Sequence, residues 1–238
     1  MRMLKRGTRT ARIAGMAALL ALTASLACAG GALAAGGQVM AADNAYDVPA
    51  PGTYTINQGQ QLTLQNVGPA NMHDVWSRLN GPDGKKLFIS PTISPGQNTV
   101  VNGTQYLTTG SYAFFCNVHP FEMSGNLAVT GAGTPQPRPS INVTVVSGKL
   151  DKVASKGKLA LKVQALTAAN DVSLEAKLGK VVIGTIPDLD VPAGQTRKAT
   201  LKLNKASKSK LAAKDKATIK VTGNVAFGSP DTVKKKLT

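Results

Sequence analysis

Residues 35–130 contain short runs in which apolar and polar residues alternate, and turn residues separate the runs. Alternation of this kind predicts β-strands with one buried face. The predicted strands are Tyr54–Ile56, Leu62–Leu64, Val75–Ser77, Leu87–Ile89, Thr99–Val101, Tyr112–Phe115 and Leu127–Val129. Gly81-Pro82-Asp83-Gly84 and Ser94-Pro95-Gly96 are turn signals. Seven or eight short strands within about 95 residues predict a β-sandwich or Greek-key barrel.

Residues 140–238 continue the alternating pattern with a different chemistry. Apolar residues predicted to face inward on four strands are Leu159, Leu161 and Val163; Val172, Leu174, Ala176 and Leu178; Ala199, Leu201 and Leu203; and Ala217, Ile219 and Val221. Lys162, Lys177, Lys202 and Lys220 are predicted to face outward, and residues 206–215 form a short helical connection. This half contains no His, Cys or Trp. It resembles the lysine-rich immunoglobulin-like modules of bacterial secreted proteins.

Charge changes abruptly between the two halves. Residues 35–130 carry three basic and five acidic residues, whereas residues 131–238 carry 20 basic and seven acidic ones. The change falls at residues 131–139, a stretch rich in Gly and Pro that is typical of a linker. We therefore expect an all-β chain with two domains, residues 35–130 and 140–238, joined by that linker.

Residues 1–34 have the pattern of a secretory signal peptide. Five basic residues precede an apolar run from Ile13 to about Ala27, and Ala32-Leu33-Ala34 has the small-x-small pattern of a cleavage site. An uncleaved membrane anchor is the alternative, although Gly, Ser and Thr dilute the run. A lipid anchor at Cys28 is less favoured, because Ser25 stands where such a signal has Leu. The mature protein is expected to be secreted or periplasmic, outside the cytoplasm.

Cys116 is then the only cysteine of the mature chain, so it cannot form an internal disulfide. His119 and Met123 follow it within eight residues, and His73 is the only other histidine. Two imidazoles and a thiolate with a weak axial thioether are the donor set of type 1 (blue) copper sites. His73, Cys116, His119 and Met123 are therefore the candidate ligands of one copper ion.

Residues 38–130 resemble the cupredoxins, such as plastocyanin, amicyanin and azurin, in these residues and in the aromatic strand before Cys116. The resemblance implies a Greek-key β-sandwich with His73 and His119 as imidazole ligands, Cys116 as thiolate and Met123 as axial ligand. The spacing from His119 to Met123 lies between those of amicyanin and plastocyanin, and Glu122 stands where an amicyanin-like loop has Met. Asp74 replaces the Asn that often follows the first His, and its side chain could bond to Asn117 in the same way.

Two histidines and the single cysteine expected in the mature chain are too few for a trinuclear, binuclear or two-site copper enzyme. We expect no enzyme activity but one-electron transfer between extracytoplasmic redox partner proteins. The alternative is a copper-buffering or trafficking protein whose metal is cargo. The basic half could tether the chain to an anionic cell-envelope polymer or membrane surface, or its lysines could simply be solvated. No nucleic-acid partner is expected.

Overall fold

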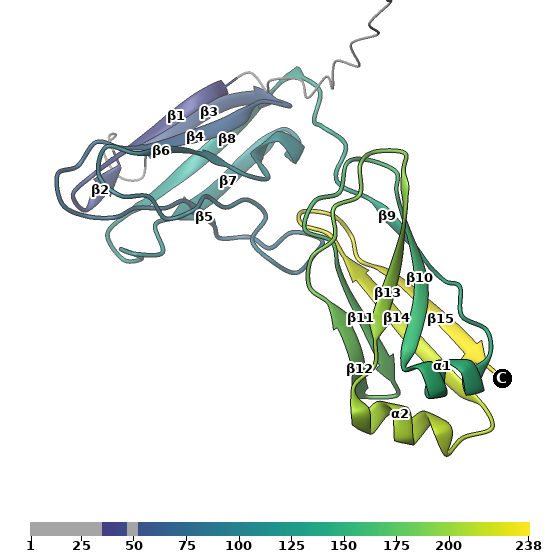
Figure 1. Ribbon diagram of the computed structural model, residues 1–238. Helices are drawn as coiled ribbons and strands as arrows, with labels where there is room; N and C mark the ends of the chain where they lie inside the picture. Colours follow the sequence, from purple (N-terminus) through teal and green to yellow (C-terminus); the bar gives the residue numbers. More distant parts are fainter. Residues whose placement is uncertain (1–34, 47–51) are drawn as a thin grey trace, which may run out of the picture. The chain divides into compact units, whose positions relative to one another are not determined.

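A computed structural model describes residues 35–46 and 52–238 of the chain. The predicted signal peptide and Cys28 lie outside the described residues. The described chain is built mainly from β-strands arranged in four sheets, with two short α-helices (Figure 1). The prediction of an all-β protein is confirmed.

Strands β1–β8 form two four-stranded sheets, with strand orders β2-β1-β4-β6 and β3-β8-β7-β5. Their bounds are β1 Ala35–Ala42, β2 Ala45–Tyr46, β3 Gly52–Gln58, β4 Gln61–Asn66, β5 Trp76–Ser77, β6 Asn98–Val101, β7 Gly110–Phe115 and β8 Ser124–Gly133. The β1–β4 and β3–β8 pairs are parallel, and the other pairs are antiparallel. Along β3 and β4 every second side chain is buried, so the inner faces of the two sheets build one core that includes Leu62, Phe88 and Phe114.

The predicted strand at Leu87–Ile89 is wrong. Ile89 makes only isolated bridges, to Trp76 and to Asn102. Pro91 follows two residues later and cannot donate a backbone hydrogen bond to a ladder. The sequence pattern also missed β1, whose Ala- and Gly-rich sequence lacks the β-branched residues by which a strand is usually recognised.

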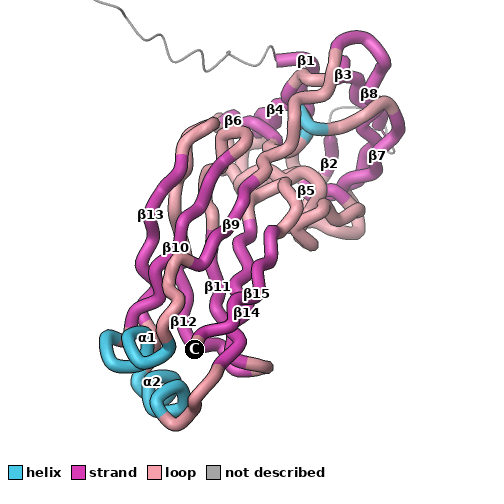
Figure 2. The backbone as a smooth tube through the Cα atoms, turned by 90° about the vertical axis from the view of Figure 1, so that its right-hand side faces the viewer, coloured by secondary structure: helices cyan, strands magenta, loops and turns pink. Residues whose placement is uncertain are grey.

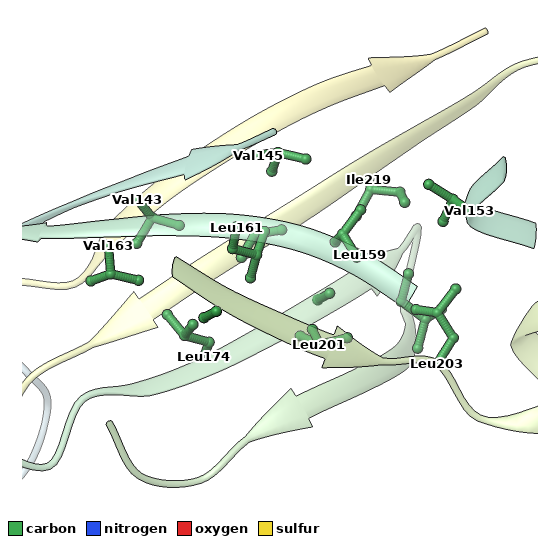
Figure 3. Close-up of a cluster of buried hydrophobic side chains, with 14 of the residues drawn as sticks. Val143, Val145, Val153, Leu159, Leu161, Val163, Leu174, Leu201, Leu203 and Ile219 are labelled. Carbon is green, nitrogen blue, oxygen red and sulfur yellow. The ribbon is translucent and has the colours of Figure 1, made fainter. Parts of the chain in front are cut away.

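Strands β9–β15 form a three-stranded sheet, β13-β10-β9, and a four-stranded sheet, β12-β11-β14-β15, in which all neighbours are antiparallel. Their bounds are β9 Ile141–Val145, β10 Lys158–Ala165, β11 Ser173–Leu178, β12 Val181–Ile186, β13 Thr196–Lys202, β14 Ala217–Asn224 and β15 Asp231–Leu237. Seven antiparallel strands divided between a three-stranded and a four-stranded sheet have the architecture of an immunoglobulin-like sandwich. Figure 3 shows Leu159, Leu161 and Val163 of β10 together with Leu174, Leu201 and Ile219 in its core.

The four strands predicted in this half are confirmed as β10, β11, β13 and β14, and the predicted helical connection is confirmed as α2 (Lys205–Ala212). Asn204 caps α2 by accepting a hydrogen bond from the Ser207 N–H. A second helix, α1 (Leu150–Lys156), was not predicted because its seven residues are too few for a helical period to stand out. Figure 2 shows α1 and α2 side by side at one end of this sandwich.

The buried apolar side chains form two separate clusters, one drawn from residues 39–129 and the other from residues 141–237. Strand β8 continues to Gly133, so the first three residues of the predicted linker extend that strand. The exact domain boundaries stay a prediction. Within the described residues, no helix is long and apolar enough to cross a membrane.

Candidate metal centre

The loop Cys116–Met123 joins β7 to β8 and carries three of the four candidate ligands. Phe115 pairs with Ser124 at the end of the ladder, and the Cys116 N–H donates to the Met123 carbonyl over 3.0 Å. This bond adds one more pair to the ladder. Opposed residues of an antiparallel pair project to the same face, with Cβ atoms about 4.5–5.5 Å apart. The side chains of Cys116 and Met123, which are 0% and 1% exposed, therefore leave the backbone on the same side.

Within the loop, the His119 carbonyl accepts hydrogen bonds from the N–H groups of Glu122 and Met123. These bonds wind residues 119–123 into a single helical turn. The turn leaves Glu122 exposed and returns Met123 to the interior. Burial therefore favours Met123 as the axial ligand, although Glu122 stands where an amicyanin-like loop has Met.

His73 reaches the same place from a different part of the chain. Its backbone pairs in both directions with Ile93, at 3.1 Å and 2.8 Å. The preceding loop is held by Asn66, a buried residue whose amide nitrogen donates to the carbonyls of Asn71 (2.7 Å) and Ile93 (3.2 Å). Sequence analysis missed Asn66, the last residue of β4, because its hydrogen bonds depend on where the chain at Asn71 and Ile93 folds back against the end of that strand.

The structure brings His73, Cys116 and His119 together. Cys116 Sγ lies 4.0 Å from His73 Nδ1 and 3.9 Å from His119 Nδ1, and the three ligand atoms lie within 4.8 Å of one another. The two imidazole rings have centroids 5.1 Å apart. Bonds of about 2.3 Å to sulfur and about 2.0–2.1 Å to nitrogen, at an angle of about 120°, separate sulfur from nitrogen by about 3.8 Å. The observed distances match ligands that share one metal ion.

Burial sets the protonation of the ligands. It raises the pKa of the Cys116 thiol, although backbone N–H groups of Asp74, His119 and Val118 partly oppose this. Burial also lowers the pKa of His73, and the neighbouring His119 lowers it further. The metal-free site therefore holds a neutral thiol and a neutral imidazole. A metal ion must displace the thiol proton, but it meets His73 already in the form that binds metals.

Asp74 joins the two ligand-bearing loops. Its Oδ1 accepts a hydrogen bond from the Asn117 N–H at 2.6 Å, and its Oδ2 accepts one from Thr92 Oγ1 at 2.9 Å. Its carbonyl accepts a further bond from the Tyr46 hydroxyl at 2.7 Å. The predicted bond between Asp74 and Asn117 is confirmed. Thr92 and Tyr46 were missed, since nothing in their local sequence marks them as partners of a residue 18 or 28 positions away.

A cluster of aromatic and basic side chains flanks Cys116 on the outward side of the ladder. Phe115 packs edge-on against its strand partner Trp76, with ring centroids 6.4 Å apart. The Lys86 ammonium lies 5.2 Å and the Arg78 guanidinium 5.0 Å from the Phe115 ring centroid. Trp76 is half-buried beneath Lys86, whose ammonium lies 5.9 Å from the Trp76 ring centroid. These groups cover the strand that leads into Cys116.

Taken together, the donor set and its geometry fit a type 1 copper site. Thiolate and thioether favour Cu(I), and imidazole suits both oxidation states of copper. The other ring nitrogen of His73, Nε2, is buried and has no hydrogen-bond partner among the described residues. The predicted cofactor, one copper ion, is consistent with every described ligand.

Comparison with solved structures gives matches over part of the chain. A mutant of amicyanin in its reduced Cu(I) form at pH 4 is 25% identical, over 39% of this chain and 80% of that chain, with a TM-score of 0.32. Dithionite-reduced auracyanin from Roseiflexus castenholzii is 18% identical, over 39% of this chain and 94% of that chain, with a TM-score of 0.31. The copper-containing nitrite reductase of Thermus scotoductus SA-01 is 21% identical, over 40% of this chain and 22% of that chain, with a TM-score of 0.32.

No protein-family model matches the chain, and no curated protein matches it. The assignment therefore rests on the chain's own features. The described residues between 35 and 133 form a β-sandwich whose last hairpin loop carries the thiolate, one imidazole and the thioether, and whose second imidazole comes from an earlier loop. This is the arrangement that the resemblance to cupredoxins implied.

Proposed function

We propose that this chain is an extracytoplasmic one-electron carrier, with one type 1 copper ion held by His73, Cys116, His119 and Met123. The observation that carries the proposal is that the ligand atoms of His73, Cys116 and His119, which come from two separate loops, lie within 4.8 Å of one another. Because both oxidation states would use the same fixed donors, little rearrangement accompanies electron transfer. Bound copper would supply the one-electron couple.

The four ligand residues differ in their exposure to solvent, and this difference assigns them different roles. His73, Cys116 and Met123 are buried, so they exclude water from the site. His119 is half-buried and is the ligand whose ring can reach the surface. Val118, which precedes His119, and Phe121, two residues after it, are exposed, Phe121 to 98%. We infer that a redox partner protein docks on these apolar side chains and exchanges the electron at the His119 imidazole edge.

The same geometry argues for a carrier rather than an enzyme. Four protein ligands would surround the ion, and none of the four positions would be left open for a substrate, unlike catalytic metal sites that keep an open position. The extracytoplasmic location follows from the predicted signal peptide in residues 1–34.

The test is copper loading followed by visible spectroscopy, voltammetry and metal analysis. The oxidised protein should show an intense thiolate-to-copper band that Cys116→Ser abolishes. Repeated redox cycles should leave the copper content unchanged. Loss of one copper per protein on reduction would instead identify the metal as cargo and contradict the carrier proposal.

Met123 is tested with a matched pair of neighbours. Met123→Gln should lower the reduction potential, because a harder oxygen ligand disfavours Cu(I). Glu122→Gln, one residue earlier and exposed, should leave the potential unchanged. An unchanged potential in Met123→Gln would show that the thioether is not a ligand.

A further inference from the structure

A pocket of about 450 Å³ lies in the immunoglobulin-like sandwich, lined by residues of α1, β10 and β13 and of the segment before α1. Its polar lining, which we call the lysine pocket, consists of Lys149, Lys152, Lys156, Lys158, Ser147 and Thr200. All four lysines are exposed. The pocket therefore combines a recess with four positive charges.

The helix places its lysines on the pocket by their spacing. Lys149, Lys152 and Lys156 are separated by three and four residues, which puts them on one side of α1. Asp151, the acidic residue of the same helix, lines other pockets instead. The helix thus directs its positive charges toward the lysine pocket and its negative charge away from it.

The outer face of the adjoining sheet extends this charge. Lys158 stands directly opposite Lys202 across the β10–β13 ladder, and Lys162 stands opposite Lys198. Like charges in such positions destabilise a sheet. None of the strands β9, β10 and β13 contains Asp or Glu, and the single ion pair found among the described residues, Lys177–Glu175, lies on β11. No ion pair among the described residues involves the lysines of this face.

The lining also restricts the chemistry of a ligand. Ser147 Oγ accepts a hydrogen bond from the Ala160 N–H, which leaves its own proton free to be donated, and Thr200 offers a second hydroxyl. Ammonium and hydroxyl donors suit phosphate oxygens. Residues 131–238 contain one aromatic residue, Phe227, so stacking of nucleobases does not contribute here.

We propose that the lysine pocket and the lysines of β10 and β13 bind a linear polymer of phosphate groups. One phosphate would enter the lysine pocket, and the polymer would continue along the strands to Lys162 and Lys198. Lys158 and Lys162 are four residues apart, about 13 Å along the strand, whereas opposed lysines are on strands about 4.8 Å apart. A flat lipid surface would meet the exposed lysines but would not enter the pocket, where Ser147 is half-buried. The proposal does not depend on the copper site.

The experiment measures binding of inorganic polyphosphate to the full mature chain by calorimetry at several salt concentrations. Lys158→Gln/Lys202→Gln removes one opposed pair at the pocket. Lys220→Gln/Lys234→Gln is the matched control, because it removes a directly opposed pair from the other sheet with the same change of charge. Each lost phosphate contact reduces the slope of log affinity against log salt by about 0.7–0.9, so the pocket variant should lose about 1.5 in slope and at least about tenfold in affinity at low salt.

The control pair should leave the slope close to that of the wild type. Equal losses in the two double variants would overturn the proposal, because they would show attraction to net charge alone. Tighter binding, per phosphate, to vesicles of anionic phospholipid than to polyphosphate would also overturn it, in favour of a membrane surface. Unfolding midpoints of both variants must match the wild type or exceed it, since each substitution relieves a like-charge pair.

Discussion

The Asp74 side chain offers the sharpest test of how the metal centre is held. Replacing Asp74 with Ala removes the acceptor of the Asn117 N–H and of the Thr92 hydroxyl together. A hydrogen bond to a charged group contributes about 1.5–3 kcal/mol. Thr92 is exposed and can bond to water instead, so the bond to Asn117, next to Cys116, is the larger loss. The loop that carries Cys116 and His119 is then free to move away from His73.

We expect Asp74→Ala to weaken copper binding about 10–100-fold, as is typical when a partner that orients metal ligands is removed. That range corresponds to about 1.4–2.7 kcal/mol, which is close to the value of the one bond at Asn117. Competition for copper against a chelator of known affinity measures the change. Urea unfolding of the metal-free variants separates loss of the fold from loss of the site.

Two further variants make this result specific. Asp74→Asn keeps an oxygen that can accept from the Asn117 N–H, so it should recover most of the affinity. Thr92→Val removes only the second bond and should change copper affinity less than Asp74→Ala does. If Asp74→Ala bound copper as tightly as the wild type, the two loops would be held by other contacts and the argument would be wrong.

Three other predictions follow from the site and its scaffold. Because burial lowers the pKa of His73 below 6.5, the unfolded metal-free chain binds a proton at a higher pH than the folded one. The free energy of unfolding should therefore be highest above about pH 7 and should fall as the pH drops through 6.5 toward the pKa of His73 in the folded protein. Urea unfolding at a series of pH values measures this profile, and His73→Gln should flatten it. Gly125→Ala would place a Cβ 2.6 Å from the Phe114 ring and should cost about 1–3 kcal/mol, whereas Gly148→Ala, with nothing within 4 Å, should be neutral in the same assay. Residues 35–133 expressed alone should bind copper with a visible spectrum like that of the full chain, because their buried apolar cluster is separate from that of residues 141–237, and failure of this fragment to fold would contradict this.

The candidate metal ligands could be predicted from the sequence more readily than the strands and hydrogen bonds that hold them. His73 and His119 are the only histidines of the chain, and Cys116 is the only cysteine outside the predicted signal peptide, so rarity and spacing were enough to predict that they meet. Strands such as β4 and β10 were recognisable because their apolar residues alternate strictly. Local periodicity reports burial on one face, and these segments have one buried face.

Elements whose stability comes from distant contacts were not predictable in this way. Strand β1 pairs in parallel with β4, and only that pairing distinguishes its Ala- and Gly-rich sequence from a loop. Strand β15 has buried residues almost only at its end, because three consecutive lysines, residues 234–236, interrupt the alternation. The partners of Asp74 were hidden for the same reason: a hydrogen bond between residues 18 or more positions apart leaves no periodic signal.

The loop from Cys116 to Met123 shows how spacing alone can mislead. Counting residues from His119 places Glu122, not the predicted ligand Met123, where an amicyanin-like loop has Met. The two bonds to the His119 carbonyl wind the intervening residues into a turn, and the bond from Cys116 to Met123 closes the loop at the strand ends. Once both ends are fixed by the β7–β8 ladder, an added residue changes the shape of the exposed turn but does not move the residue that opposes Cys116. The position of Met123 therefore depends on its register with Cys116, and loops of different length can present the same ligand set.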